Sequence, residues 1–549
     1  MTAAIYYHPE GYSTRRENLM GRHAAGESFL RGFLRHSTGA EFWAMIGEQA
    51  HGEEFSRQVR AAGRSEPTRL LTRSAMGELA QPGCYYLPGP GVGEQAWQRA
   101  YFGHGQWSLC GITHTTCSDR VMTSLCDLLT APVQSWDAVI CTSKAVRENV
   151  VRLIQGQADY LSQRLGASRV VMPMLPVIPL GVHCDDFAIA APEKAEARRQ
   201  LGIDAETLVV LFLGRLTFTA KSHPLAMYQA LQSAARECGK RLLLVECGWF
   251  PHQGYADSFD EAAALACPDV ARLHLDGRKP DERRRAWAAA DIFCSLSDNI
   301  QETFGLVPLE AMAAGLPVVV SDWDGYRDTV RHGVDGFRVP TVMPEAGLGR
   351  DLAMRYGLEL DNYDRYCGYV GQFTAVDVGG AAQALAELIR SPELRRSMGE
   401  AGRARARSEF DWAAIIPQYE ALWRQQAEIR QREASSLPPL RHPWPARPDP
   451  FHVFGGYATQ TLTRDLPLGL VGEDVQSVLG RLRASRSLRM VSFADGILPD
   501  LSETEALLAA FAAGPRTPEQ VLGSMPENRR PALYRALSWL VKLGLLRLA

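Results

Sequence analysis

Short apolar runs alternate with longer helical patterns along most of this chain, and this alternation restricts its fold more than any other feature. Apolar runs predict strands at residues 3–7, 138–142, 209–213, 241–246, 292–295 and 317–321. Helical patterns follow the first two runs, over residues 21–35 and 143–153. Strands that alternate with helices belong to parallel sheets, and the run 208–213, which has no polar alternation, is typical of a sheet covered on both faces. The pattern therefore predicts an α/β fold.

The length of 549 residues and two breaks in composition predict several domains. A single core stops growing at roughly 250–300 residues. A polar, alanine-rich stretch over residues 188–199 precedes a new strand, and six prolines lie between Pro438 and Pro450, where no helix can continue. We predict α/β domains over residues 1–190 and 191–410, a helix over 411–430, a proline-rich linker over 431–455 and a small, mainly helical domain over 456–549.

Charge and cysteine usage exclude several classes of protein. The formal net charge of −3 provides no general attraction to nucleic acid or to anionic lipid. The 11 cysteines include no Cys-x-x-Cys pair and lie mostly in apolar runs, which indicates reduced, buried thiols rather than disulfides or a zinc site. The N-terminus has no secretory signal pattern, and no apolar stretch reaches the ~18 residues of a spanning helix. We therefore expect a cytoplasmic protein without a transmembrane segment, whose membrane contact would be peripheral, at the inner membrane face.

The C-terminal region changes to helical patterns with few strands. Ser502 with Glu505 and Thr517 with Gln520 have the spacing of capping boxes, and a longer helix is predicted over residues 531–543. Short helices followed by a terminal apolar segment suggest a winged-helix-like module. Residues 481–549 contain ten Lys or Arg and six Asp or Glu, a net charge of +4. DNA binding and protein contact both stay open, but so modest a charge favours a protein partner and no nucleic-acid partner.

The segment 291–321 carries the most informative motif. A strand ends near Ser295, a helix begins near Gly305 and runs to about Ala314, and Gly315 ends it before the next strand. The N-terminus of this helix therefore lies at the C-terminal edge of a parallel sheet. Free backbone amides in such a place suit a phosphate or a sugar hydroxyl. These amides belong to Phe304, Gly305 and Leu306.

Two glutamates flank the start of this helix. Glu302 stands just before it and Glu310 about two turns into it, so that they can contact opposite ends of an extended ligand. Gly305 between them has no side chain and lets a ligand approach the backbone closely. Glutamates at this spacing arise by chance in a chain with 62 acidic residues, so their meaning depends on the whole string.

The string Glu302-Thr-Phe-Gly-Leu-Val-Pro-Leu-Glu310, followed by Ala-Met-Ala-Ala-Gly-Leu-Pro-Val-Val, resembles the donor-binding motif of the retaining glycosyltransferases of family 4. Over roughly residues 1–430, further segments resemble that family in the expected order, namely 138–147, 177–187, 212–216 with Lys221, and 332–337. The resemblance implies the GT-B fold, in which two Rossmann-like domains face a cleft. The first domain then receives the acceptor, the second binds the nucleotide-sugar donor, and the helix 411–430 crosses back to the first.

Arg215 and Lys221 carry the positive charge that such a donor needs. The resemblance assigns them, with Gly214, to the diphosphate-binding motif. A diphosphate carries about two negative charges, and another develops on the leaving nucleotide during the reaction. Two cations at a strand end can stabilise this negative charge without a metal. The loop 217–221 is one residue longer than the family pattern, which makes Arg215 the stronger prediction of the two.

The resemblance also implies roles for residues of both domains. Glu302 holds a hydroxyl of the donor sugar, Glu310 accepts hydrogen bonds from the ribose hydroxyls, and His114 closes on the sugar from the first domain. Gly21 and Gly26 resemble the glycine-containing loop that touches donor or acceptor, although packing explains such glycines as well. We expect no cofactor and no metal, since the nucleotide-diphosphate sugar is itself a substrate.

Together these observations predict a retaining glycosyltransferase that moves a hexosyl group from a nucleotide-diphosphate sugar, in the synthesis of surface polysaccharide or another glycoconjugate. Two alternatives stay open: a phosphate-dependent sugar phosphorylase of the same fold, and a sugar-nucleotide-binding scaffold or regulator that acts through residues 456–549. The acceptor, whether glycan, lipid-linked sugar or protein, is undetermined. Loops near residues 36–107 are idiosyncratic, and the aromatic-rich insertion 341–377 is either a lid or an oligomer contact.

Overall fold

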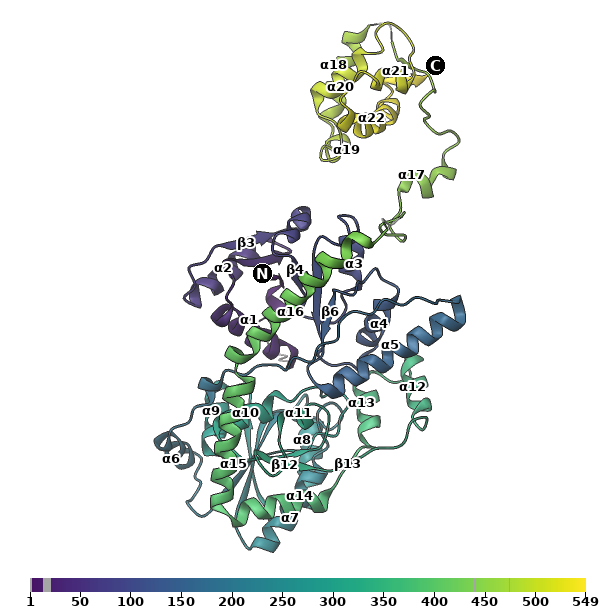
Figure 1. The fold of residues 1–549 in the computed structure, drawn as a ribbon. Coiled ribbons are helices and arrows are strands. Elements are labelled where there is room, and N and C mark those ends of the chain that lie inside the picture. The colour runs from purple at the N-terminus through teal and green to yellow at the C-terminus, as the bar shows by residue number, and fades with distance from the viewer. Residues whose placement is uncertain (1, 13–20, 439–440, 473) are drawn as a thin grey trace. The chain divides into compact units, whose positions relative to one another are not determined.

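The computed structural model of the chain describes residues 2–12, 21–438, 441–472 and 474–549. They form two compact units, Met1–Trp444 and Pro445–Ala549. The first unit contains two parallel six-stranded sheets with their helices (Figure 1). Within the described ranges, none of the helices combines the length and the apolar character needed to span a lipid bilayer.

The N-terminal domain is built on a sheet with the strand order β3-β2-β1-β4-β5-β6. The strands are β1 Ala4–Tyr7, β2 Phe42–Ile46, β3 Thr68–Leu71, β4 Cys84–Tyr86, β5 Ser108–Ile112 and β6 Ala138–Ile140. Successive residues of β1 belong to two different cores, with Ile5 and Tyr7 in one cluster and Ala4 in another. Both faces of the sheet are therefore buried, which explains why β1 shows no polar alternation.

Helices accompany this sheet, and the region 36–107 supplies three of its strands. In the described part of the domain the helices are α1 Gly21–His36, α2 Gln49–Ala61, α3 Gly93–Ala100, α4 Asp119–Cys126 and α5 Lys144–Leu165. The loops of residues 36–107 connect three strands of the sheet, β2, β3 and β4. The strands β3 and β4 have only four and three residues, too few to show a pattern in the sequence.

The second domain repeats the same design with the order β12-β11-β10-β7-β8-β9. When its strands are counted from β7, both sheets have the 3-2-1-4-5-6 order of a Rossmann fold. The strands are β7 Leu208–Arg215, β8 Leu242–Trp249, β9 Ala271–Asp276, β10 Ile292–Ser295, β11 Val318–Ser321 and β12 Gly336–Val339. The helices are α6 Ala191–Gln200, α7 Leu225–Cys238, α8 Gln253–Ala266, α9 Pro280–Ala289, α10 Leu306–Ala314, α11 Tyr326–Thr329, α14 Val378–Arg390 and α15 Pro392–Arg405.

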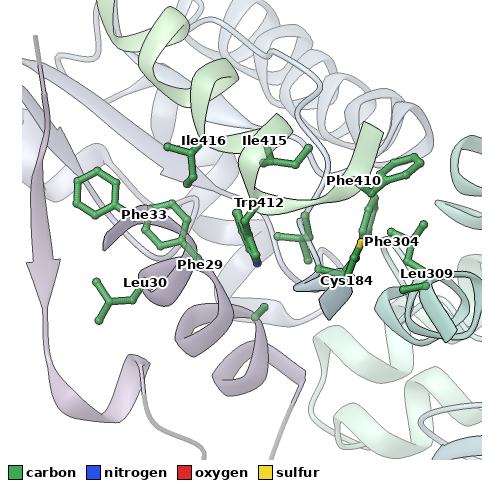
Figure 2. Packing of buried hydrophobic residues seen from close by; sticks show 14 of the residues in the cluster. Phe29, Leu30, Phe33, Cys184, Phe304, Leu309, Phe410, Trp412, Ile415 and Ile416 are labelled. Atoms are coloured by element: carbon green, nitrogen blue, oxygen red, sulfur yellow. The ribbon is translucent and has the colours of Figure 1, made fainter. Parts of the chain in front are cut away.

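A long helix, α16 (Trp412–Glu433), connects the second domain back to the first. Asp411 caps its start by accepting a hydrogen bond from a backbone N–H of the first turn. Trp412 is fully buried against Phe29 of α1, at the centre of the core shown in Figure 2. Two turns from the other end, the Gln426 amide donates to a backbone carbonyl of β5 at 2.8 Å. Two Rossmann-like domains with a returning helix are the GT-B architecture, so the predicted fold class is confirmed.

The insertion 341–377 forms a substructure of the second domain that we call the arm. Its ends pair as an antiparallel ribbon, β13 (Thr341–Val342) with β14 (Ala375–Val376). Between them lie α12 (Arg350–Gly357) and α13 (Tyr363–Gly371). Side chains of these two helices form hydrogen bonds with residues 115–119 of the N-terminal domain. The arm therefore contacts the other domain of its own chain.

The proline-rich region starts on the N-terminal domain. After α16 ends at Glu433, the ring of Trp444 stacks on that of Trp97 in α3, with the ring centroids 6.4 Å apart and nearly parallel. The division between the two compact units falls directly after Trp444. The stacked indoles thus attach the first part of this region to the first unit.

The second unit is a small, mainly helical domain with an apolar core of its own. Its main helices are α18 Val475–Arg486, α20 Leu501–Ala509, α21 Pro518–Leu522 and α22 Arg530–Lys542. A short antiparallel pair, β15 (Leu468–Leu470) with β16 (Leu546–Leu548), joins the segment before α18 to the segment after α22. The predicted helical character of this region is confirmed.

One of the two predicted capping boxes in this unit is wrong. Thr517 and Gln520 form the predicted box of α21. The box of α20 consists of Asp500 and Glu503, two residues before the predicted pair. Glu503 also accepts hydrogen bonds from the Arg529 guanidinium at 2.6 and 2.7 Å. A long-range ion pair therefore favours one of two caps that the local sequence allows equally.

Candidate functional site

The predicted donor residues meet at the C-terminal edge of the second sheet. Arg215 is the last residue of β7, and Glu302 lies in the loop that follows β10. These two strands are parallel neighbours, and the strand order reverses between them. In doubly wound sheets, ligands bind outside the strand ends at such a reversal. The topology therefore brings the two parts of the predicted site together.

Lys221 and Glu302 form an ion pair at this edge. The Lys221 ammonium donates to Glu302 Oε2 at 2.6 Å, and the side chains are only 24% and 12% exposed. Burial alone would raise the pKa of Glu302, but the charge of Lys221 and the backbone amides of Thr303 and Phe304 hold it below its usual value. Glu302 is therefore an anion, and the longer loop does not keep Lys221 out of the site.

Arg215 is held by neutral acceptors. Its Nη2 donates to Gln301 Oε1 and to the backbone carbonyl of Ala220, both at 3.1 Å. No carboxylate among the described residues pairs with Arg215, so its charge is not neutralised within that part of the protein. A Cβ on Gly214 would lie 3.4 Å from Lys221 Cε, which shows that this glycine borders the second cation. The two cations thus lie on either side of one loop.

The start of α10 differs from the prediction in one respect. Gly305 has φ of +90°, and a Cβ there would collide with the ring of Tyr326. The glycine therefore makes room for Tyr326, whose hydroxyl lies 3.5 Å from Glu302 Oε2, and a ligand is not needed to explain it. The Phe304 side chain is part of the core, with 1% exposed, and Leu306 is partly buried. Donor binding by the amides of these three residues stays a prediction.

Glu310 is partly buried in α10. Burial raises the pKa of its carboxyl to about 7, against the positive charge of Arg283. The helix contacts the 3-10 turn η4 (Cys184–Phe187) of the interdomain segment. In that turn, Asp186 pairs with Arg31 of α1 at 2.6 Å. Glu310 thus belongs to a region where the second domain meets the segment that joins it to the first.

The N-terminal domain contributes the loop that follows β5. His114, the second residue of this loop, is half-buried. The residues on both sides of it are fixed, since Thr113 Oγ1 accepts a hydrogen bond from the Thr142 backbone N–H at 3.2 Å and Thr115 Oγ1 lies 3.1 Å from the Tyr363 hydroxyl of the arm. His114 is therefore held at the edge of the first sheet that contacts the second domain. Its catalytic role stays a prediction.

The structure gives Gly26 a packing role. A Cβ there would collide with the backbone carbonyl oxygen of Gly11, so α1 passes the turn after β1 at backbone distance. Gly21 is the first residue of α1, and what surrounds it lies outside the described part of the structure. Contact of either glycine with donor or acceptor stays a prediction.

Sequence reasoning missed a polar contact between the domains beside this site. Ser143, the N-cap of α5, donates to the Thr303 carbonyl oxygen at 2.9 Å and lies 3.2 Å from Asp324 Oδ1. Asp328 Oδ2 accepts a hydrogen bond from the Lys144 backbone N–H at 2.7 Å. Burial raises the pKa of Asp324 well above its usual range. Two acidic residues of the second domain therefore lie at the N-terminus of α5, where the helix dipole favours a negative charge on Asp328 while burial keeps Asp324 protonated.

A cavity of about 450 Å³ lies elsewhere between the two domains of the first unit. Its lining includes Lys144 and Pro179 of the N-terminal domain and Asp328 and Arg405 of the second. Of the predicted site residues it contains only Phe304. The cavity is therefore distinct from the edge that carries Arg215, Lys221 and Glu302.

The sequence of the second domain resembles a known family. Residues 193–347 match the family Glycosyl transferases group 1. This group 1 segment contains the donor motif from Glu302 to Glu310 and both cations, Arg215 and Lys221. It ends at residue 347, before the helices of the arm begin.

Curated relatives resemble the chain over part of its length. The chain is 36% identical over 193 residues to a D-inositol 3-phosphate glycosyltransferase of Thermobispora bispora, which covers 34% of this chain and 43% of the relative. It is 33% identical over 169 residues to a phosphatidyl-myo-inositol mannosyltransferase of Mycobacterium tuberculosis, which covers 31% and 40%. The chain thus spans less than half the length of these relatives. Among solved structures, Anabaena Alr3699/HepE in complex with UDP and glucose has a TM-score of 0.49 and 15% identity, over 77% of this chain and 100% of that one.

Proposed function

We propose that the chain is a retaining glycosyltransferase that transfers a hexosyl group from a nucleotide-diphosphate sugar to an acceptor. The observation that carries this proposal is the arrangement of Arg215, Lys221 and Glu302 at the strand-order reversal of a group 1 segment. Two cations beside a hydrogen-bond-accepting anion match a ligand that is anionic in one part and rich in hydroxyls in another.

In this proposal the donor lies along the edge of the second sheet. Arg215 and Lys221 bind the diphosphate. Glu302 accepts a hydrogen bond from a hydroxyl of the sugar, and Glu310 accepts hydrogen bonds from the ribose hydroxyls. The 2.6 Å ion pair holds Lys221 and Glu302 next to each other before a ligand arrives. Groups arranged in advance need little rearrangement during the reaction, which is how enzymes stabilise developing charge.

The proposed chemistry places the main demand on the cations. When the bond between sugar and diphosphate breaks, a further negative charge develops on the leaving nucleotide, and Arg215 and Lys221 stabilise it without a metal. The leaving phosphate accepts the proton of the acceptor hydroxyl on the same face of the sugar, which retains the anomeric configuration. His114 closes on the sugar from the first domain, and contact between the domains keeps water from the donor.

A hydroxyl-rich molecule bound to the N-terminal domain is the acceptor class that we propose. The two relatives are named for an inositol phosphate and a phosphatidyl-inositol, and glycans, lipid-linked sugars and glycosylated proteins offer the same chemistry. The reaction takes place in the cytoplasm, with peripheral access to the inner membrane face when the acceptor is lipid-linked. The C-terminal unit serves as a winged-helix-like module that contacts a protein partner.

A donor panel tests the proposal. The purified chain is incubated with UDP-, GDP- and ADP-sugars in phosphate-free buffer, nucleotide release is measured, and thermal shifts are recorded with UDP, GDP and ADP. We expect one nucleotide to raise the unfolding midpoint and the matching donor to be turned over. Glu310→Ala should lose at least about tenfold in nucleotide affinity because a ribose contact is removed, while Glu261→Ala, at an exposed position of α8, should behave as wild type.

The same panel separates the alternatives. When the panel is repeated with inorganic phosphate and a glycan in place of the nucleotide sugars, turnover that requires phosphate would identify a phosphorylase. A thermal shift without turnover of any donor would identify a sugar-nucleotide-binding scaffold. Neither shift nor turnover with any nucleotide would overturn the assignment of the donor site.

A further inference from the structure

The arm places a tyrosine between the two domains. Gln301 Nε2 donates to the Tyr363 hydroxyl at 3.0 Å, and the same hydroxyl lies 3.1 Å from Thr115 Oγ1. Because the hydroxyl accepts from Gln301, its own hydrogen is available for Thr115. On the other side, Gln301 Oε1 accepts from Arg215 at 3.1 Å. One continuous series of hydrogen bonds therefore runs from Arg215 to the loop that carries His114.

The helix that carries Tyr363 is anchored to the diphosphate loop of its own domain. Asn299 Nδ2 donates to the Thr219 carbonyl oxygen at 2.9 Å and to the Cys367 carbonyl oxygen at 3.4 Å. Gly368 packs so closely on Thr219 that an added Cβ would lie 3.1 Å from it. α13 is therefore attached to the loop 217–221 by hydrogen bonds and by close packing.

The surroundings of Tyr363 keep its hydroxyl protonated. Burial, reinforced by the neighbouring thiols of Cys117 and Cys367, raises the pKa of Tyr363 above its usual range. A protonated phenol can accept one hydrogen bond and donate another at once, whereas a phenolate could only accept. The series of hydrogen bonds from Gln301 to Thr115 depends on this state.

We propose that Tyr363 is a positioning residue for the transfer reaction. It links the diphosphate-binding Arg215 to the His114 loop, so that donor binding aligns the two domains in the hydrogen-bonded arrangement described above, in which we call them in register. This inference rests on the proposed function. It assigns a role to the arm, whose helices lie beyond the group 1 match. Tyr363 touches neither sugar nor phosphate in this scheme, so it acts through Gln301 and Thr115.

A kinetic experiment tests the link. Tyr363→Phe removes only the hydroxyl, and Tyr369→Phe, at a 39% exposed position of the same helix, is the matched control. We expect Tyr363→Phe to lower kcat about tenfold, roughly the effect of one lost hydrogen bond in a buried series, with less than a threefold change in donor KM. The control should match wild type. In an Arg215→Ala background, Tyr363→Phe should have no further effect, because the two residues act together.

A second readout does not depend on turnover. Cys117 Sγ of the first domain lies 3.7 Å from Cys367 Sγ of α13, and the hydrogen bond from the Cys367 thiol lowers the pKa of Cys117. An aromatic disulfide reagent can join them by exchange: the Cys117 thiolate attacks the reagent and releases one thiol, and Cys367 then displaces the second. The protein loses two protons and two electrons, and the reagent becomes two thiols. The share of Cys117-labelled protein that goes on to form the Cys117–Cys367 link reports how often the domains are in register. Unlike the overall rate, this share does not depend on how readily Cys117 first reacts, which the Tyr363 hydroxyl, 3.5 Å from its Sγ, itself affects.

The two readouts together distinguish failure of this inference from failure of the proposed function. We expect Tyr363→Phe to lower this share at least threefold, measured by mass spectrometry of the joined and the singly labelled peptides, with no change for Tyr369→Phe. An equal share in wild type and Tyr363→Phe, or an equal loss in the control, would overturn the inference even if the wild type is an active transferase. A wild type that turns over no donor would overturn the proposed function, while the cross-linking result would still decide whether Tyr363 holds the domains in register.

Discussion

The C-terminal edges of the two sheets carry different kinds of polar groups. At the second edge, charged side chains are held within their own domain, as in the pair of Lys221 with Glu302. At the first edge, the hydroxyls of Thr115 and Ser143 form neutral hydrogen bonds to the other domain. The difference suggests a division of labour, in which the second domain stabilises the charge of the ligand and the first is positioned against it mainly through hydroxyl and backbone groups.

The largest expected effect comes from removing a charge at the second edge. Arg215→Ala should lower kcat/KM for nucleotide release by about 100- to 1,000-fold, because the protein loses a positively charged hydrogen-bond donor that faces the negative charge developing on the leaving nucleotide. Arg236→Ala is the matched control, since Arg236 is exposed on α7 and pairs with Asp269. Steady-state nucleotide release measures both. A loss of less than tenfold for Arg215→Ala would contradict the proposed difference between the two edges, because the second edge would then not be the one that stabilises the charge of the ligand.

Glu302→Gln should have the next largest effect. The substitution keeps the shape of the side chain but leaves the partly buried Lys221 ammonium without its carboxylate. We expect kcat/KM to fall about 10- to 100-fold, from the combined loss of a charged hydrogen bond to the sugar and of the ion pair. The exposed Glu261→Gln of α8 serves as the control in the same assay. Wild-type turnover in Glu302→Gln would exclude contact between this residue and the sugar.

The raised pKa of Glu310 predicts opposite pH dependences for stability and for nucleotide binding. Its pKa is about 7 in the folded chain, above the ordinary 4.5. Between these values the folded chain binds a proton that the unfolded chain has lost, so the free energy of unfolding decreases as pH rises from about 4.5 to 7 and is constant above. Nucleotide affinity should increase through pH 7, since the carboxylate is the better acceptor for ribose hydroxyls.

Glu310→Gln tests both dependences at once. Because the amide does not titrate, the variant should be more stable than wild type above pH 7, by about 1–3 kcal/mol, and equal to it near pH 4.5. Its nucleotide affinity should be independent of pH through this range. Urea unfolding and titration calorimetry at pH 5, 6, 7 and 8 measure the two quantities. An unchanged slope of stability with pH would show that Glu310 titrates normally.

The smallest expected effect lies at the first edge. Ser143→Ala removes the N-cap of α5 and the hydrogen bond to Thr303, and Ser118→Ala removes a comparable N-cap, that of α4. Each should cost about 1 kcal/mol of stability. Only Ser143→Ala should also lower turnover, about two- to fivefold, because Ser143 forms a hydrogen bond with the second domain. Equal turnover in the two variants would show that this contact has no part in the reaction.

Much of the second edge could be predicted from the sequence because its residues are close together along the chain. Glu302, Gly305 and Glu310 lie within one loop and helix, and the apolar run before them places that loop at a strand end. The contact of Tyr326 with Glu302 could not be predicted in this way, since the two residues are 24 apart and the strand β11 lies between them. No local spacing connects residues on either side of a complete strand.

The hydrogen bonds between the domains could be predicted even less from local sequence patterns. Tyr363 and Thr115 are 248 residues apart in sequence, and nothing in an aromatic-rich insertion distinguishes one tyrosine from the others. The same limit explains the misplaced capping box, since the ion pair of Glu503 with Arg529 spans 26 residues. Contacts of this kind depend on which surfaces the folded domains bring together.

The sequence by itself determined the α/β class, the edge where the predicted donor residues meet and the charges that they carry, because local apolar patterns and short motifs encode them. Only the tertiary structure decided that Lys221 reaches Glu302, that Gly305 makes room for Tyr326 and that the arm contacts the His114 loop. The physical reason is that these contacts join residues distant in sequence, whose distances are set by the packing of strands and helices around the core and not by the chain near each residue.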